Sequence, residues 1–251
     1  MFQRTLQKTH GVIEHECRHL DRLRESLKSG HGVMLCANHP RTADAVSMGF
    51  VAKETPCVFN VMASWHLFNQ GWFNRFMLRM LGGFSVNREG LDRQAIDEAI
   101  GILTDAKRPL LIFPEGTTSR TNDQLMALME GPAFIARNAA KRREKNNSGA
   151  VVVHPVAIKY VFSGDLERAA NVVLTDIERR LTWRPSPDEP LVDRLIKVGN
   201  ALLTLKELQH HINVPENSTL KDRQNAMVDH LLDPLETKWL GSPRREELPS
   251  G

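Results

Sequence analysis

Short apolar runs and longer segments with a helical period alternate along the first two thirds of the chain. The five runs of strand length are GVMLCANH, CVFNVMAS, GGFSVNR, LLIFPEG and AVVVHPVAIKYVF, the last two expected to be buried. Helices are predicted in the segments between them, and residues 65–81 have the period of one helix that Gly71 interrupts. This alternation predicts an α/β fold with a mostly parallel central sheet flanked by helices, a mixed sheet being the alternative.

The two ends of the chain have a different pattern. Residues 1–29 predict one amphipathic helix, because five apolar side chains fall on one stripe and Gly30 follows as a cap. We expect this helix to pack on the core, with a membrane-surface anchor as the alternative. After residue 165 the pattern becomes helical and charged, and we find no internal repeat. We therefore expect an N-terminal helix (1–29), a core (30–165) and a helical C-terminal extension of the same domain (166–251).

Composition narrows the function classes. The chain of 251 residues carries 33 basic and 30 acidic side chains, and this net charge of +3 is too mild to indicate nucleic-acid binding. It fits an anionic substrate or membrane surface if the charge is locally concentrated. Three cysteines without a CxxC pair predict a reduced, intracellular protein. No uncharged run reaches the roughly 18–20 residues of a membrane span, so we expect any membrane contact to be peripheral.

Several kinds of chemistry lack their sequence signals. The chain has no HExxH or comparable ligand spacing, so we expect no metal, and it has no GxSxG, Walker or GxGxxG sequence. Cys36 lies within an apolar run and is expected to be a buried filler rather than a nucleophile. His154, also within an apolar run, is expected to be a hydrogen-bonded core histidine.

Polar side chains follow three predicted strands, at the sheet edge where sites of α/β proteins form. His39 ends the first strand and Asp44 begins the next helix. The carboxylate could accept a hydrogen bond from one ring nitrogen, which leaves the other to take a proton from a substrate hydroxyl. The His-x4-Asp spacing is weak evidence by itself, and a purely structural contact is the alternative.

The order of the motifs is more specific. NHPRTAD, GGFSVNR and FPEGTTSR resemble the first three sequence blocks of the glycerolipid acyltransferase family, which includes lysophosphatidate and glycerol-3-phosphate acyltransferases. HPVAIKY resembles the fourth block. The resemblance covers about residues 30–165, so it implies that this core is catalytic and has a glycerol-3-phosphate acyltransferase-like fold.

The resemblance also implies roles for individual residues. His39 would be the general base and Asp44 its partner, and Arg88 would bind the acceptor's phosphate. The wall of the acceptor site would contain Glu115, Gly116 and Thr117. Glu115 would hold an acceptor hydroxyl or orient a nearby arginine, an ordinary ion pair being the alternative.

The implied reaction transfers an acyl group from acyl-CoA or an acyl carrier protein to a lysophospholipid, with 1-acylglycerol-3-phosphate as the first candidate, and needs no cofactor. Glycerol-3-phosphate, another lysolipid or an amino-acid-based lipid remain alternative acceptors. A thioester or phosphoester hydrolase using the same pair, and a membrane-binding module without catalysis, are the alternatives outside this class.

The chain departs from the family pattern around the acceptor. Arg41 stands where the family usually has serine, and it is either a replacement anion ligand or a solvent-facing side chain. Thr118 stands where arginine is common, with Arg120 two residues later, and Glu130 replaces a frequent lysine. These differences leave the acceptor's identity open.

An aromatic segment suggests how a lipid substrate would be reached. Its apolar side chains share one helical face, with two arginines on the flank. They are Trp65, Phe68, Trp72, Phe76 and Met80, flanked by Arg75 and Arg79. A core helix and a helix at the headgroup boundary are both compatible with this stripe. With the lipid chemistry above, we expect a cytoplasmic protein associated peripherally with the membrane.

Overall fold

The computed structural model of the protein describes residues 2–55, 57–80, 82–87, 90, 92–215 and 217–242. The chain forms two compact units, Met1–Val161 and Phe162–Gly251, and each is described by itself. In the part of the chain that is described, no helix is both long enough and apolar enough to cross a membrane.

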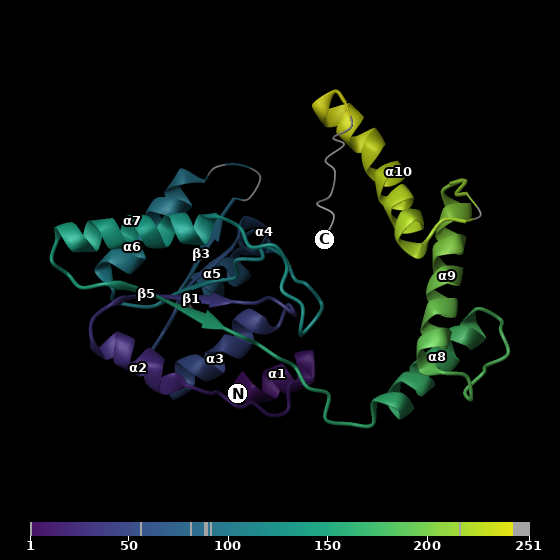
Figure 1. Ribbon diagram of the computed structural model, residues 1–251, viewed down its shortest axis with the longest axis horizontal. Coiled ribbons are helices and arrows are strands. Elements are labelled where there is room, and N and C mark those ends of the chain that lie inside the picture. Colours follow the sequence, from purple (N-terminus) through teal and green to yellow (C-terminus); the bar gives the residue numbers. More distant parts are fainter. Residues whose placement is uncertain are drawn as a thin grey trace. The chain divides into compact units, whose positions relative to one another are not determined.

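The first unit is built on a five-stranded sheet (Figure 1). Its strands are β1 (Gly32–Ala37), β2 (Asn60–Ser64), β3 (Gly83–Val86), β4 (Leu110–Ile112) and β5 (Val151–Val156). The strand order is β3-β2-β4-β1-β5, and every neighbouring pair runs parallel. This arrangement confirms the predicted α/β class, with a parallel rather than a mixed sheet.

Position in the sheet explains the burial of the strands. β4 is buried and β1 almost entirely so, because they lie in the middle of the sheet and their side chains pack in the apolar clusters on both faces. β2, between β3 and β4, is only partly buried. β5 lies at the edge and is only partly buried, so the prediction of a long buried strand at AVVVHPVAIKYVF is wrong. An edge strand accommodates Pro155, which has no N–H to donate to a neighbouring strand.

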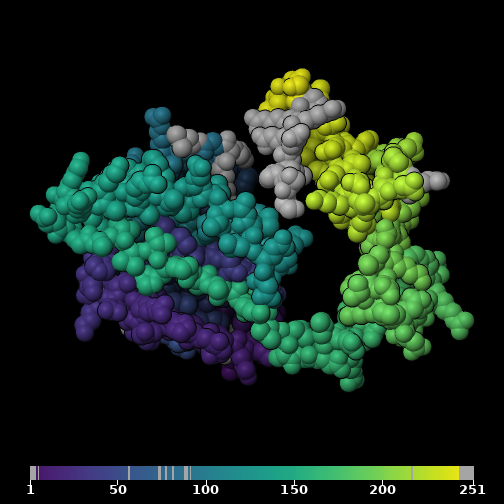
Figure 2. Space-filling model, in the orientation of Figure 1, coloured from purple at the N-terminus to yellow at the C-terminus, as the bar shows by residue number. Residues whose placement is uncertain are grey.

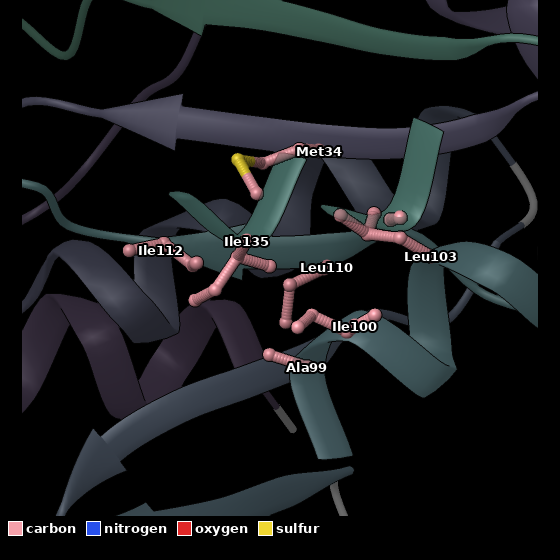
Figure 3. Close-up of a cluster of buried hydrophobic side chains, with 8 residues drawn as sticks. Met34, Ala99, Ile100, Leu103, Leu110, Ile112 and Ile135 are labelled. Atoms are coloured by element: carbon pink, nitrogen blue, oxygen red, sulfur yellow. The ribbon is translucent and has the colours of Figure 1, made fainter. Parts of the chain in front are cut away.

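Helices pack on both faces of the sheet (Figure 1). One face contacts α6 (Arg93–Asp105) and α7 (Gly131–Lys145), and the other contacts α2 (Leu20–Lys28) and α3 (Asp44–Glu54). Alternate side chains of β1 serve the two faces, since Met34 packs with α6 and α7 whereas its neighbours pack with α2 and α3. Figure 3 shows the first of these two clusters.

The N-terminal segment is two helices instead of one. α1 (Phe2–His10) ends before Gly11, whose φ of +68° departs from helical geometry, and α2 begins at residue 20. The prediction of a single helix over 1–29 is therefore wrong, and Ile13 of its apolar stripe is 48% exposed. Gly30 does follow the end of α2 in a left-handed conformation, as expected of a cap.

The aromatic segment also divides. α4 (Trp65–Phe68) and α5 (Trp72–Met80) are separated at Gly71, where φ is +117°. Phe68 is buried, whereas Trp72 is 80% exposed. The interruption thus turns the two halves of the predicted stripe toward different surroundings.

The second unit consists of α8 (Leu166–Arg180), α9 (Leu191–Gln209) and α10 (Leu220–Leu240), which pack in succession. Arg194, in the first turn of α9, is completely buried against α8. Both carboxylate oxygens of Glu178 accept from its guanidinium, at 2.9 and 2.8 Å. Asn171 and Thr175 accept its remaining hydrogen bonds.

The same arrangement joins α9 to α10. Arg223 donates to both carboxylate oxygens of Glu207 at 2.8 and 2.6 Å, to Asn200 at 2.9 Å and to Thr204 at 2.8 Å. Each of these residues lies 29 positions after its counterpart in the first cluster. The expectation that the chain has no internal repeat is therefore wrong.

Candidate active site

The register of the sheet brings the two main sequence motifs together. Cys36 of β1 pairs with Ile112 of β4, and three residues after each lie His39 and Glu115. The backbone N–H of His39 donates to Glu115 Oε1 at 2.8 Å. The carboxyl ends of two neighbouring strands therefore form the centre of the candidate site, as expected for a parallel sheet.

His39 and Asp44 form the expected contact. Asp44 lies in the first turn of α3, is fully buried, and accepts from His39 Nδ1 at 2.7 Å through Oδ2. The backbone N–H of Arg41 donates to the same oxygen at 2.8 Å. The carboxylate thereby fixes the tautomer in which Nδ1 carries the hydrogen and Nε2 carries the lone pair. Nε2 makes no hydrogen bond with any residue that the structure describes.

The imidazole ring is held from its face as well. The ring of Phe113 stacks on it with 4.3 Å between centroids and 23° between planes. Ser119 N–H donates to the carbonyl of His39 at 2.9 Å, which ties the end of β1 to the loop after β4. The ring is thus fixed by its partner, its backbone and an aromatic neighbour.

Glu115 lies buried at this edge of the sheet, and its expected role toward an acceptor stays a prediction. Its carboxylate is buried and bridges two backbone N–H groups, that of His39 and, at 3.3 Å, that of Met126. It forms no ion pair with a described residue. In this position it joins the end of β1 to the loop that precedes α7, a role that the sequence alone did not indicate.

The other expected site residues are placed unequally. Gly116 has φ of +72°, and a Cβ there would lie 2.7 Å from Met129 Sδ, so the turn requires glycine. Thr117 is exposed. Arg88, the expected phosphate ligand, lies outside the described residues. The roles of all three in acceptor binding stay predictions.

Two side chains at the site have roles that the sequence analysis did not find. Tyr160 donates its O–H to Asp44 Oδ1 at 2.7 Å, and the Ser47 hydroxyl lies 3.1 Å from the same phenol oxygen. Tyr160 is 116 residues from Asp44 along the chain. No local pattern could have indicated this contact, although Tyr160 is the only tyrosine in the chain.

The sequence predicts structural roles for Cys36 and His154. Burial raises the pKa of Cys36, which keeps its thiol protonated and makes it a poor nucleophile. His154 Nε2 lies 2.9 Å from the Ser26 hydroxyl, and burial lowers the pKa of His154, assisted by the charge of Arg22. Cys36 is partly buried against the first apolar cluster, as a structural role requires, whereas His154 is hydrogen-bonded but only partly buried on the edge strand and is not part of the core.

The sequence comparisons support the same conclusion as the geometry. Residues 17–159, more than half of the chain, match the acyltransferase family, and the chain belongs to this family. This match confirms the resemblance inferred from the sequence blocks. The 1-acyl-sn-glycerol-3-phosphate acyltransferase of Streptococcus pneumoniae (strain ATCC BAA-255 / R6) is 34% identical over 112 residues. Those residues are 43% of this chain and only 38% of that protein. No solved structure matches the chain.

Proposed function

We propose that the protein transfers a fatty acyl group from an acyl thioester to the free hydroxyl of a lysophospholipid. The observation that carries this proposal is the His39–Asp44 pair, whose outer nitrogen is left to accept a proton at the carboxyl edge of the sheet. Membership of the acyltransferase family supports it. The name of the S. pneumoniae relative makes 1-acylglycerol-3-phosphate the first candidate acceptor.

The proposed chemistry proceeds without a covalent acyl-enzyme. His39 Nε2 takes the proton of the acceptor hydroxyl while that oxygen attacks the thioester carbonyl. Asp44 stabilises the imidazolium that forms. Collapse of the tetrahedral intermediate breaks the C–S bond, and the imidazolium returns the proton to the departing thiolate. The products are an ester and a free thiol.

The substrates are proposed from the sequence motifs. Arg88 would bind the acceptor's phosphate, and Glu115, Gly116 and Thr117 would belong to the wall around it. The donor would be acyl-CoA or an acyl carrier protein. The reaction needs neither a metal nor a cofactor, because the acid–base pair and an activated thioester suffice.

Exposed apolar side chains support action at a membrane surface. On α5, Trp72, Phe76 and Met80 are 80%, 54% and 66% exposed. The loop between β4 and α7, which lies on the surface (Figure 2), exposes a second apolar group. That group is Leu125, Met126, Leu128 and Met129. Aromatic and aliphatic side chains beside a lipid-handling site suit peripheral contact with a bilayer.

One assay with purified protein tests the proposal. Acyl-CoA or acyl carrier protein thioester is supplied with 1-acylglycerol-3-phosphate, glycerol-3-phosphate, other lysophospholipids or no acceptor, and thiol release and lipid product are followed. We expect thiol release that depends on the lysophospholipid and equals the ester formed. Release without an acceptor would instead indicate the hydrolase, and no release with either donor would contradict both.

A further inference from the structure

One contact of the catalytic pair is not used in the mechanism above. Asp44 Oδ2 accepts from His39 and from a backbone N–H, whereas Oδ1 accepts from the Tyr160 hydroxyl at 2.7 Å. A tyrosine has a single O–H proton, and here it is donated to Asp44. The Ser47 hydroxyl, 3.1 Å from the phenol oxygen, is therefore the donor to Tyr160. A relay of two hydroxyl groups thus ends on the buried carboxylate.

The fold fixes Tyr160 through its backbone. After β5 the chain continues in an irregular segment. Two asparagines from other parts of the fold each hold one residue of this segment, by bonding both its backbone N–H and its backbone carbonyl. Asn38 accepts from Ile158 N–H at 2.6 Å and donates to its carbonyl at 3.0 Å. Asn122 accepts from Tyr160 N–H at 3.0 Å and donates to its carbonyl at 2.7 Å. The segment is thereby held between the end of β1 and the loop after β4.

The charges around Tyr160 keep it a donor. Burial raises the pKa of Tyr160, and the hydrogen bond and charge of Asp44 raise it further. The Ser47 hydrogen bond and the Arg41 charge oppose this rise without cancelling it, so the phenol stays protonated. The Arg41 guanidinium lies 4.8 Å from the centre of its ring. Among the described residues, Glu115 in the loop after β4 and His39 itself also lie at this edge of the sheet. Lys159 is exposed and paired with an aspartate.

We propose that Tyr160 is a positioning residue, which orients the Asp44 carboxylate so that Oδ2 stays aligned with His39. Nothing else described occupies Oδ1, and a buried carboxylate oxygen without a donor is unfavourable. With the hydroxyl removed, the carboxylate can rotate about its own axis and the imidazole loses its fixed orientation. The kinetic consequences of this inference rest on the proposed function. The orienting of Asp44 by Tyr160 rests on the hydrogen bonds alone.

The test is the Tyr160→Phe variant, which keeps the ring beneath Arg41 and removes only the hydroxyl. We expect kcat to fall on the order of tenfold, since a hydrogen bond to a charged group is lost, with little change in KM for the acceptor. The acid limb of the pH–rate profile should move to higher pH. Without the Tyr160 hydrogen bond, the Asp44 carboxylate carries more of its negative charge toward His39 and favours the protonated imidazole. Because activity requires unprotonated His39, a higher pH is then needed to reach it. Ser47→Ala should cause a smaller move in the same direction.

A second measurement tests the positioning role of Tyr160 separately from the proposed acyl transfer. The ring of His39 is followed by NMR while pH is changed, in the wild-type protein and in both variants, with no substrate present. A midpoint that is higher in Tyr160→Phe supports the positioning role even if no acyl transfer is found. If transfer occurs but neither the midpoint nor the acid limb moves, Tyr160 only packs, and the proposed function stands. If Tyr160→Phe does not fold, Ser47→Ala decides the question. An unchanged His39 midpoint in Ser47→Ala would then overturn the proposal.

Discussion

Glu115 illustrates how a side chain acts through backbone groups rather than through charge. Its two carboxylate oxygens accept from the N–H groups of His39 and Met126, which lie on different segments. A carboxylate can accept at both oxygens, whereas an amide can accept only at one. The contact with the loop between β4 and α7 therefore requires the second carboxylate oxygen, which an amide would not provide.

Glu115→Gln tests this dependence. The amide oxygen can still serve His39, but its NH2 group then faces the Met126 N–H, and this mismatch should cost about 1–3 kcal/mol. We expect faster hydrogen exchange in residues 120–130 and a higher KM for the acceptor, with kcat retained. Glu130→Gln, an exposed change in the same loop, is the matched control. A large loss of kcat with an unchanged loop would contradict the account.

The sequence predicted the residues whose partners are near in the chain. His39 and Asp44 are five residues apart, and the strand-to-helix turn between them was enough to predict their contact. Tyr160 and Glu115 act through contacts more than 70 residues away, which depend on the strand order and the register. Strand order cannot be read from a local apolar pattern, so these two roles required the structure.

At the scale of single elements, local patterns predicted where strands and helices occur better than which of their faces are buried. The apolar spacing of residues 65–80 predicts one helix, yet the positive φ of Gly71 divides the segment into α4 and α5. Arg143 carries a charge, yet it is buried in the last turn of α7. Its guanidinium donates to backbone carbonyls of Gly30, Leu103, Thr104, Ser148 and Gly149. This buried guanidinium site is formed by carbonyls of three segments, at residue 30, residues 103–104 and residues 148–149, so a local pattern could not predict it.

The exposed face of α5 gives a prediction about membrane contact. Replacing Trp72 and Phe76 together by serine should weaken binding to vesicles containing anionic phospholipid by at least tenfold, because each aromatic contributes more than about 1 kcal/mol when it enters the headgroup region. Thermal unfolding and turnover of a soluble short-chain acceptor should change little. Sedimentation with vesicles measures the first effect.

Val58→Ser is the matched control for that experiment. Val58 is 52% exposed and precedes β2, at the opposite edge of the sheet from the site. Equal loss of vesicle binding in the control would mean that apolar surface in general, rather than α5, drives the contact. Loss of folding in the double variant would favour a core role for this helix.

At the scale of the whole chain, the two units are stabilised by different means. The first has two apolar clusters on either side of a parallel sheet. The second joins its helices through buried arginine–glutamate pairs that recur after 29 residues, and its helix ends recur too, with Thr182 and His211 both at positive φ. The repeat is also present in the sequence: the pattern N-x-x-L-T-x-x-E followed by L-x-D-R begins at Asn171 and again at Asn200. The hydrogen bonds show what these repeated residues do.

The arginine–glutamate pairs predict acid sensitivity of the second unit. Hydrogen bonds from Arg194 and Arg223 lower the pKa of Glu178 and Glu207 below the ordinary value of 4.5. The unfolded chain therefore binds protons first as pH falls, and the pairs' contribution to stability is present above pH 4.5 and lost below it. Pulse hydrogen exchange of α8–α10, after equilibration between about pH 6 and about pH 3, should show this loss. In the double variant Arg194→Gln, Arg223→Gln, protection should depend less on pH. If protection of the wild-type helices is the same at the acid end as at the neutral end, the predicted acid sensitivity is wrong.

The central claim is that His39 performs acid–base chemistry in acyl transfer. The most direct measurement compares the wild-type protein, His39→Ala and the exposed control His211→Ala, with acyl-CoA and 1-acylglycerol-3-phosphate in vesicles. We expect ester formation to fall by about 10²–10⁴-fold in His39→Ala alone, the usual contribution of a positioned general base. Ester formation by His39→Ala at the wild-type rate, with the same acceptor dependence, would show that the claim is wrong.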